Sequence, residues 1–298
     1  MSEHVQQMFL RGRDMMRPVL PRRWRPDVAV VPVLRLAGVI GFSTPLRPGL
    51  TLAGLARALD RLFGVRRAAA VAVVINSPGG SAVQSHLIFS RIRQLAEEKK
   101  LPVIAVVEDV AASGGYMIAC AADVIVVDPS SIIGSIGVVG ATFGFNEAMK
   151  KLGVERRVYT AGDRKVTLDP FLPENPEDVE RLKAIQREIH AGFIDLVKGR
   201  RGDKLAGHDD DLFSGEYWGA RTALSLGLVD RIGDIRTYLR EQYGEEVMTP
   251  LVMQERGLFG RRVPPGVGAL ADAWNGAGFA DEIISALETR AMWGRYGL

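Results

Sequence analysis

The sequence of 298 residues predicts an α/β fold built around a parallel sheet. Continuous apolar runs of strand length recur along the chain, and turns of small residues follow them. Segments with helical spacing of apolar residues come after these turns. Runs that are apolar throughout are typical of strands covered on both faces, and strand–helix alternation is typical of βαβ units.

The first half of the chain supplies most of the expected elements. Apolar, valine-rich runs predict strands at 28–36, 39–42, 68–76, 101–109 and 122–129. Helices are expected at 51–63 with Thr51 as N-cap, from the turn after 76 to about 99, and in a short segment through 120.

The second half is expected to be mainly helical. A strand is predicted at 154–160, and a long helix at 176–200 has its acids early and its bases late, which suits the helix dipole. Shorter helices are expected at 216–228 and 233–242, and one more within 269–290. We therefore divide the chain into a basic N-terminal arm (1–27), a main domain (28–247) and a C-terminal extension (248–298).

Charge and composition narrow the function classes. The net charge of +3 is too small to predict a nucleic-acid partner. Six arginines and one acid lie between Arg11 and Arg25, among apolar residues, so residues 1–26 are either a solvated arm or a peripheral membrane contact. No run approaches the roughly 20 apolar residues of a spanning helix, and no secretory signal is seen. We expect a cytoplasmic protein, with or without contact to the membrane surface.

No cofactor or metal is expected. The chain has one cysteine, Cys120, and its four histidines are far apart in the sequence. It contains neither HExxH nor a paired CxxC, and neither GxxxxGK[ST] nor GxGxxG.

Two glycine-containing turns follow expected strands, at 76–81 (NSPGGS) and 111–115 (AASGG). Ligands bind beyond the carboxyl ends of the strands in open α/β sheets. A Gly–Gly pair allows backbone N–H groups to approach a ligand closely, and two converging N–H groups form an oxyanion hole. These turns therefore predict an oxyanion-binding site.

Ser113 lies between an expected strand and an expected helix, where it is either a helix cap or a nucleophile. A nucleophilic serine needs a base, and no histidine is expected near a small-residue turn. A neutral lysine can serve, because burial can lower the usual lysine pKa of about 10.4 by 3–5 units. Lys165 follows the strand predicted at 154–160; it is either this base or an ordinary loop lysine.

Five segments taken in order resemble the signal peptide peptidase A family of Ser/Lys serine peptidases. They are INSPGG (75–80), EDVAASGGYMIACAAD (108–123), SSIIGSIGVVG (130–140), TAGDRKVTLDPF (160–171) and ARTALSLGLVDRIG (220–233). The resemblance covers about two thirds of the chain. It implies a Clp protease/crotonase-like fold with repeated ββα units and additional C-terminal helices.

The resemblance also implies roles for individual residues. Ser113 would be the nucleophile, and Lys165 the general base. The amides of Gly79, Gly80 and Gly114 would form the oxyanion hole. Ser135, in the GSIG segment, would orient the amine of Lys165.

The implied activity is hydrolysis of extended, mainly apolar peptides, such as remnant signal peptides, by a homo-oligomeric ring. Two alternatives stay open. One is a crotonase-like acyl-CoA enzyme, which holds a thioester oxyanion with two backbone amides of the same fold. The other is a non-catalytic peptide-binding scaffold.

Overall fold

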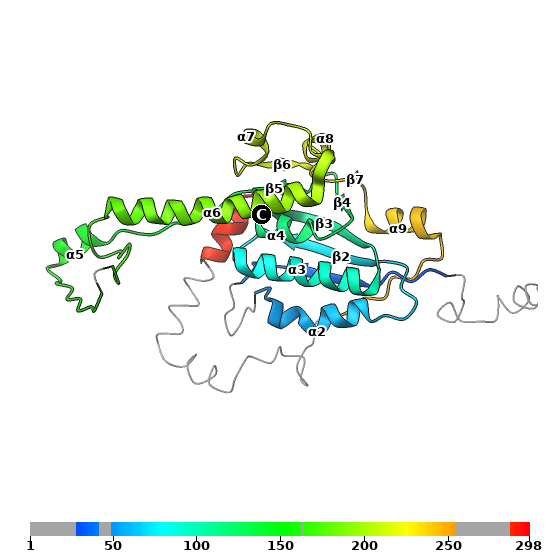
Figure 1. Cartoon of the computed structure of the whole chain (residues 1–298), viewed down its shortest axis with the longest axis horizontal. Coiled ribbons are helices and arrows are strands. Elements are labelled where there is room, and N and C mark those ends of the chain that lie inside the picture. Colours follow the sequence, from blue (N-terminus) through cyan, green and yellow to red (C-terminus); the bar gives the residue numbers. More distant parts are fainter. Residues whose placement is uncertain (1–27, 42–48, 163, 254–286) are drawn as a thin grey trace, which may run out of the picture.

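A mainly parallel sheet lies at the centre of the computed structural model, which describes residues 28–41, 49–162, 164–253 and 287–298 (Figure 1). Five of its seven strands form the path β1-β2-β3-β4-β7, and all neighbours along this path are parallel. This confirms the predicted α/β class. The strands of the path are β1 Val33–Ala37, β2 Val71–Ser77, β3 Val103–Ala112, β4 Val124–Val127 and β7 Arg231–Ile232.

The two remaining strands extend the sheet at the carboxyl end of β3. β5 (Ile132–Gly134) pairs in parallel with the last residues of β3, and β6 (Tyr217–Gly219) pairs antiparallel with β5. The pairing of β2 with β3 is irregular just before this point. β3 advances from Val107 to Ala111 while β2 advances only from Ile75 to Ser77. Such bulges change the direction of a strand, and here the bulge lies at the end that leads to Ser113.

Helices cover both faces of the sheet. Alternate side chains of β1 to β3 point into one core with α2 (Leu52–Phe63), α3 (Ala82–Lys99) and α4 (Gly114–Ala119). The other side chains form a smaller core with α9 (Ile235–Tyr243). Burial on both faces explains why the strands of this sheet are apolar at nearly every position.

The helices expected at 51–63, from the end of the turn at 77–84 to about 99, and at 176–200 are confirmed as α2, α3 and α6 (Pro176–Arg201), although α3 begins at Ala82, within the expected turn. The Thr51 hydroxyl accepts a hydrogen bond from the Gly54 amide at 3.2 Å, so the predicted cap is present. α6 begins with an Asn175 cap followed by proline, which suits the first helical position. Further helices of the described residues are α5 Asn146–Leu152, α7 Asp209–Leu212, α8 Ala220–Ser225 and a 3₁₀ turn, Gly202–Lys204.

Three expectations about secondary structure are wrong. The described part of the 39–42 segment is not a strand, because Ile40 makes only isolated bridges, to Leu50 and Gly80. Residues 154–160 do not form a strand: all seven are exposed, and no neighbouring strand supplies the hydrogen bonds that a strand requires. The helix expected at 216–228 is shorter than predicted. Residues 217–219 instead form β6, where the Trp218 ring lies over Gly134 of β5.

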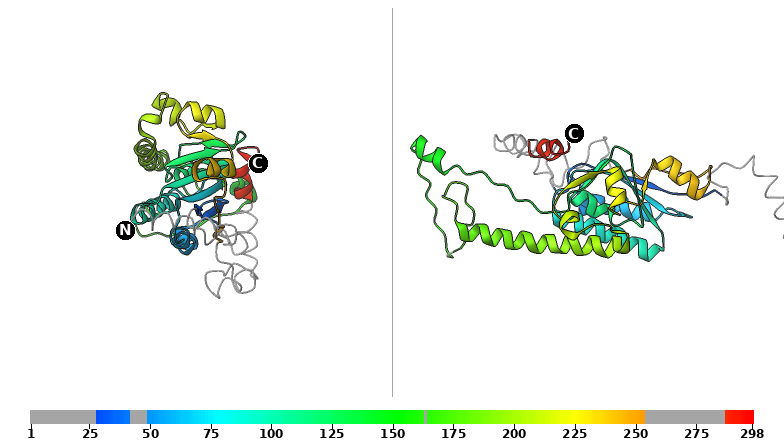
Figure 2. Two further views of the ribbon diagram at one scale, coloured as in Figure 1. Left: turned by 90° about the vertical axis from the view of Figure 1, so that its right-hand side faces the viewer. Right: turned by 90° about the horizontal axis from the view of Figure 1, so that it is seen from above.

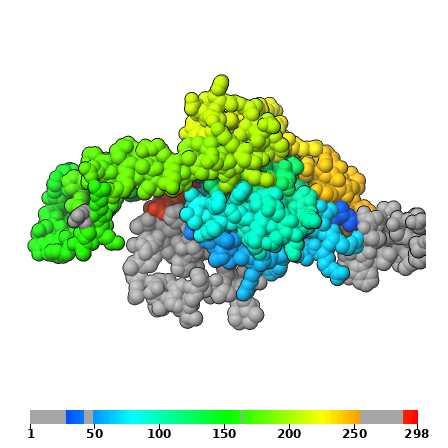
Figure 3. All heavy atoms as spheres, in the orientation of Figure 1, coloured from blue at the N-terminus to red at the C-terminus, as the bar shows by residue number. Residues whose placement is uncertain are grey.

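A long arm projects from the body of the molecule (Figure 2). We define it as residues 139–189, which comprise an outgoing segment, α5, the returning loop and the first half of α6. None of its described residues is buried. Several of its apolar side chains are largely exposed, and Figure 3 shows the arm extending away from the compact body. The most exposed are Tyr159 (89%), Phe143 (79%) and Leu152 (77%).

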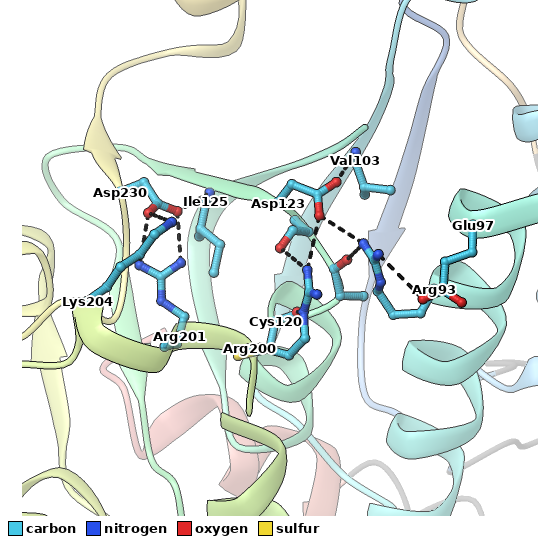
Figure 4. A network of polar contacts seen from close by, with 12 residues as sticks. Arg93, Glu97, Val103, Cys120, Asp123, Ile125, Arg200, Arg201, Lys204 and Asp230 are labelled. Atoms are coloured by element: carbon cyan, nitrogen blue, oxygen red, sulfur yellow. Dashed lines mark hydrogen bonds and ion pairs between the residues drawn. The ribbon is translucent and has the colours of Figure 1, made fainter. Parts of the chain in front are cut away.

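Ionic contacts attach the second half of α6 to the body (Figure 4). Arg201 is 3% exposed and forms a pair with Asp230, to which Lys204 also donates. Arg200 donates to the carbonyls of Cys120 and Ala122, just after α4. The C-terminal half of α6 is therefore fixed beside α4, and its N-terminal half extends into the arm.

Parts of the expected terminal segments lie outside the described residues. These are the whole N-terminal arm and residues 254–286 of the C-terminal extension. Residues 287–294 are helical, and Trp293 and Tyr296 pack against Val110 and Ala112 of β3. In the part of the chain that the structure describes, no helix combines the length and the apolar character needed to cross a membrane.

Candidate active site

Ser113 lies at the junction of β3 and α4, in a strained conformation. Its φ of 51° and ψ of −122° are rare for a residue with a side chain. Its amide donates to the Gly134 carbonyl at 2.8 Å, and its carbonyl accepts from the Met117 amide at 3.0 Å. Strain of this kind persists only where the surroundings fix the backbone, and it is common at functional sites.

The Ser113 hydroxyl does not cap the helix. Ser113 therefore occupies the N-cap position of α4 without the side-chain hydrogen bond that stabilises a cap. The residue is half-buried at the sheet's carboxyl edge, and its hydroxyl makes no hydrogen bond within the described residues. It is thus placed to act on a ligand at this edge.

The Gly79–Gly80 turn lies directly against Ser113. A methyl group on Gly79 would lie 2.8 Å from Ser113 Cβ and 3.0 Å from the Gly114 amide nitrogen. A methyl group on Gly80 would lie 2.1 Å from the Ile40 carbonyl oxygen. Both residues also have positive φ, of 103° and 142°. Only glycine fits here, so the structure brings the two predicted glycine turns together.

The backbone N–H groups of the two glycine turns differ in their hydrogen-bond partners. The Gly79 amide donates to the Ser77 hydroxyl at 3.2 Å, and the Gly79 carbonyl accepts from the Ile40 amide. The amides of Gly80 and Gly114 have no acceptor in the described part of the chain. These two N–H groups are therefore available to a ligand, and that of Gly114 adjoins Ser113 in the chain.

Ser135 lies in the next segment of the same edge. Gly134, which accepts the Ser113 amide, immediately precedes it, and the Ser135 amide donates to the Glu216 carbonyl at 2.6 Å. Its φ of 53° is also left-handed. The structure thus places a second strained serine next to Ser113.

Lys165 is not brought to Ser113 within the chain. It is exposed and lies in the returning loop of the arm, where its amide donates to the Gly162 carbonyl at 3.2 Å. The arm carries this loop away from the sheet edge (Figure 2). The remaining predicted residues, Gly79, Gly80, Gly114 and Ser135, gather around Ser113.

His190 is a residue that sequence reasoning missed. The expectation that no histidine lies near a small-residue turn is wrong, because His190 Nε2 lies 3.0 Å from the Ile136 carbonyl oxygen in the GSIG turn. The two residues are 54 positions apart, and no local pattern joins them. Only the path of α6 across the site creates the contact.

Cys120 cannot compete with Ser113 as the nucleophile. Its thiol is fully buried at the end of α4, and burial raises its pKa to about 12. Tyr116 in the same helix is also buried. Burial raises its pKa, and its hydroxyl donates to the Leu228 carbonyl at 2.7 Å. Among the described residues, no group of histidine, cysteine, aspartate and glutamate side chains forms a metal-binding cluster.

A serine at a strained strand-to-helix turn, close to glycine amides without an acceptor in the described part of the chain, is compatible with nucleophilic chemistry on an α/β sheet. The model of Peptidase family S49 matches residues 95–246. The chain belongs to peptidase family S49, a family of serine peptidases similar to signal peptide peptidase A.

Two curated relatives and one solved structure illustrate the similarity. A Brucella abortus protein named Na(+)/H(+) antiporter NhaA is 54% identical over 95% of this chain, which covers 39% of that protein. The chloroplastic serine protease SPPA of Arabidopsis thaliana is 35% identical over 56% of this chain and 24% of its own length. A mutant of a membrane-bound stomatin-specific protease aligns with 80% of this chain and 99% of its own, at 18% identity and a TM-score of 0.43. The chain thus spans well under half the length of these two curated relatives.

Proposed function

We propose that this chain is a serine endopeptidase that cleaves extended, mainly apolar peptides, such as remnant signal peptides, with Ser113 as nucleophile and Lys165 as base. One observation carries the proposal: Ser113 is held in a strained turn directly against Gly79, and the following amide of the same turn, Gly80, and that of Gly114 have no acceptor among the described residues. Membership of family S49 supports the same chemistry.

The reaction is acyl transfer in two stages. Lys165 Nζ accepts the Ser113 Oγ proton as Oγ bonds to the peptide carbonyl carbon, and the carbonyl electrons move to the oxygen. The amides of Gly80 and Gly114 donate to this oxyanion. The C–N bond then breaks, and the Lys165 ammonium gives its proton to the leaving amine.

Water completes the cycle. It gives a proton to Lys165 and attacks the ester carbon, and collapse of the second oxyanion releases the acid. Ser113 Oγ takes the proton back from Lys165. We assign Ser135 the role of orienting the Lys165 amine, because its turn adjoins Ser113.

Assembly of several copies would bring the base to the nucleophile. We propose a homo-oligomeric ring in which the arm of one subunit places Lys165 at Ser113 of its neighbour. Lys165 is exposed on the arm, which also carries the exposed side chains of Tyr159, Phe143 and Leu152. Both observations support this arrangement. Exposed apolar surface of this kind marks a contact surface, and burial at the contact would favour the neutral amine that a base requires.

The test is hydrolysis of fluorogenic apolar peptides from pH 6 to 10 by wild type, Ser113→Ala and Lys165→Ala. We expect turnover by wild type alone, rising with pH, and labelling of Ser113 by a fluorophosphonate. Turnover by Ser113→Ala would exclude Ser113 as the nucleophile. Absence of both turnover and labelling in wild type would favour the peptide-binding scaffold. Stabilisation by acyl-CoA in a thermal-shift assay would favour the crotonase-like alternative.

We also propose that residues 1–26, which lie outside the described part of the chain, contact an anionic membrane surface. Their arginines and apolar residues support this proposal. Flotation with anionic liposomes tests it on residues 1–298 and on a 27–298 truncation. Equal recovery of both would contradict it.

A further inference from the structure

His190 marks the point where the arm leaves the body. Phe193 and Val197, the next residues along this side of α6, are buried in the main core, whereas no described residue of the arm itself is buried. At this point His190 meets the segment that runs out from the GSIG turn, and its Nε2 lies 3.0 Å from the Ile136 carbonyl oxygen.

The contact is the first of a series along α6. His190, Gln186 and Leu182 are spaced four residues apart, so they lie on one side of the helix. A methyl group on Gly140 would lie 2.9 Å from Gln186 Nε2 and 3.7 Å from Leu182 Cδ2. The outgoing segment therefore runs along this side of α6, beginning at His190.

The GSIG turn is held from two sides. From the β6 side, the Ser135 amide donates to the Glu216 carbonyl at 2.6 Å. From the α6 side, His190 bonds the carbonyl of Ile136, the residue after Ser135, and among the described residues this is the only hydrogen bond between α6 and the turn. A left-handed φ such as that of Ser135 persists only where such contacts fix it.

We infer that His190 is a positioning residue of the active site: it holds the GSIG turn, and with it Ser135, against Ser113 at the root of the arm that carries Lys165. This inference rests on the proposed peptidase function. The carbonyl of Ile136 can only accept, so His190 must present Nε2–H. Both the Nε2–H tautomer and the imidazolium ion can do this, and so can a glutamine amide.

The experiment compares His190→Gln, which keeps an N–H donor, with His190→Leu, which has a similar size and no donor. We expect His190→Leu to lower kcat about tenfold with KM within about twofold, the size of effect expected for one hydrogen bond that acts through a neighbouring group. His190→Gln should stay within about twofold of wild type in both constants. His208→Ala, on an exposed histidine before α7, is the matched control and should leave both unchanged.

A double-variant comparison separates positioning from a general structural role. If His190 acts through Ser135, then His190→Leu should cost little further activity in a Ser135→Ala background. Losses that multiply, or equal losses for His190→Gln and His190→Leu, would overturn the inference. Absence of turnover and of Ser113 labelling in wild type would instead overturn the peptidase function on which it rests.

Discussion

The two halves of the proposed catalytic pair lie in regions of opposite character. Ser113 is half-buried between β3 and α4, and Gly79 and Gly134 hold it through close contact and a hydrogen bond. Lys165 is exposed on an arm in which no described residue is buried. Contacts within one chain therefore hold the proposed nucleophile in place, whereas the proposed base is surrounded by solvent. The comparison indicates that folding of a single chain positions the nucleophile, whereas contact with a second subunit would be needed to position the base.

The largest effect on peptidase activity is expected from a substitution in the glycine turn next to Ser113. Gly80→Ala would place a methyl group 2.1 Å from the Ile40 carbonyl oxygen, so the turn must move and the proposed oxyanion hole would be displaced. We expect peptidase activity to fall by about 10²–10³-fold, as for loss of one oxyanion donor. Gly199→Ala, where a methyl group meets nothing within 4 Å, is the control and should keep full activity. Activity retained by Gly80→Ala would contradict the proposed oxyanion hole.

The next largest effect is a loss of folding stability, expected when the ion pair at the C-terminal end of α6 is removed. Arg201→Met removes a buried arginine, leaves half-buried Asp230 without its main partner and should lower the free energy of unfolding by about 3 kcal/mol, since Lys204 still donates to Asp230. Lys204→Met removes an exposed partner and should cost about 1 kcal/mol or less. Urea unfolding measures both. Equal losses in the two variants would show that burial does not set the strength of this contact.

The same pair predicts a pH dependence. Burial opposes ionisation of Asp230, but hydrogen bonds from Arg201, Lys204 and the Ile125 amide outweigh it and lower the pKa of Asp230. The carboxylate therefore stabilises the fold above its unfolded-state pKa of about 3.9, and this stabilisation is lost as the pH falls through the lower folded-state pKa. In Asp230→Asn, the unfolding temperature should decline less steeply in acid than in wild type. An unchanged acid slope would count against this contribution.

The smallest effect on stability is expected from the arm. The double variant Phe143→Ser/Tyr159→Ser removes side chains that are 79% and 89% exposed. Its free energy of unfolding should change by only about 0.5 kcal/mol, yet its mass by light scattering should fall if the arm joins subunits. Val83→Ser, at a 67% exposed position on the body, is the control. An unchanged mass in the double variant would argue against assembly through this part of the arm.

The sequence predicts the body better than the arm for a physical reason. Apolar runs and caps report burial and local hydrogen bonding, so α2, α3, β2 and the glycine turns could be predicted from them. Residues 154–160 contain the β-branched and aromatic residues that are typical of strands, but they have no strand beside them. The contact of His190 with Ile136 depends on the path of α6 across the site, which no local pattern encodes.

The central claim is that Ser113 and Lys165 act together across two subunits, and mixing two inactive variants tests it most directly. Ser113→Ala and Lys165→Ala are dissociated, combined in equal amounts and reassembled. If subunits exchange at random, about one site in four pairs an intact serine with an intact lysine, and about a quarter of wild-type peptidase activity should return. Recovery would support a site shared between neighbours. If the mixture stays inactive under conditions where mixed wild-type subunits recover fully, the shared site is contradicted.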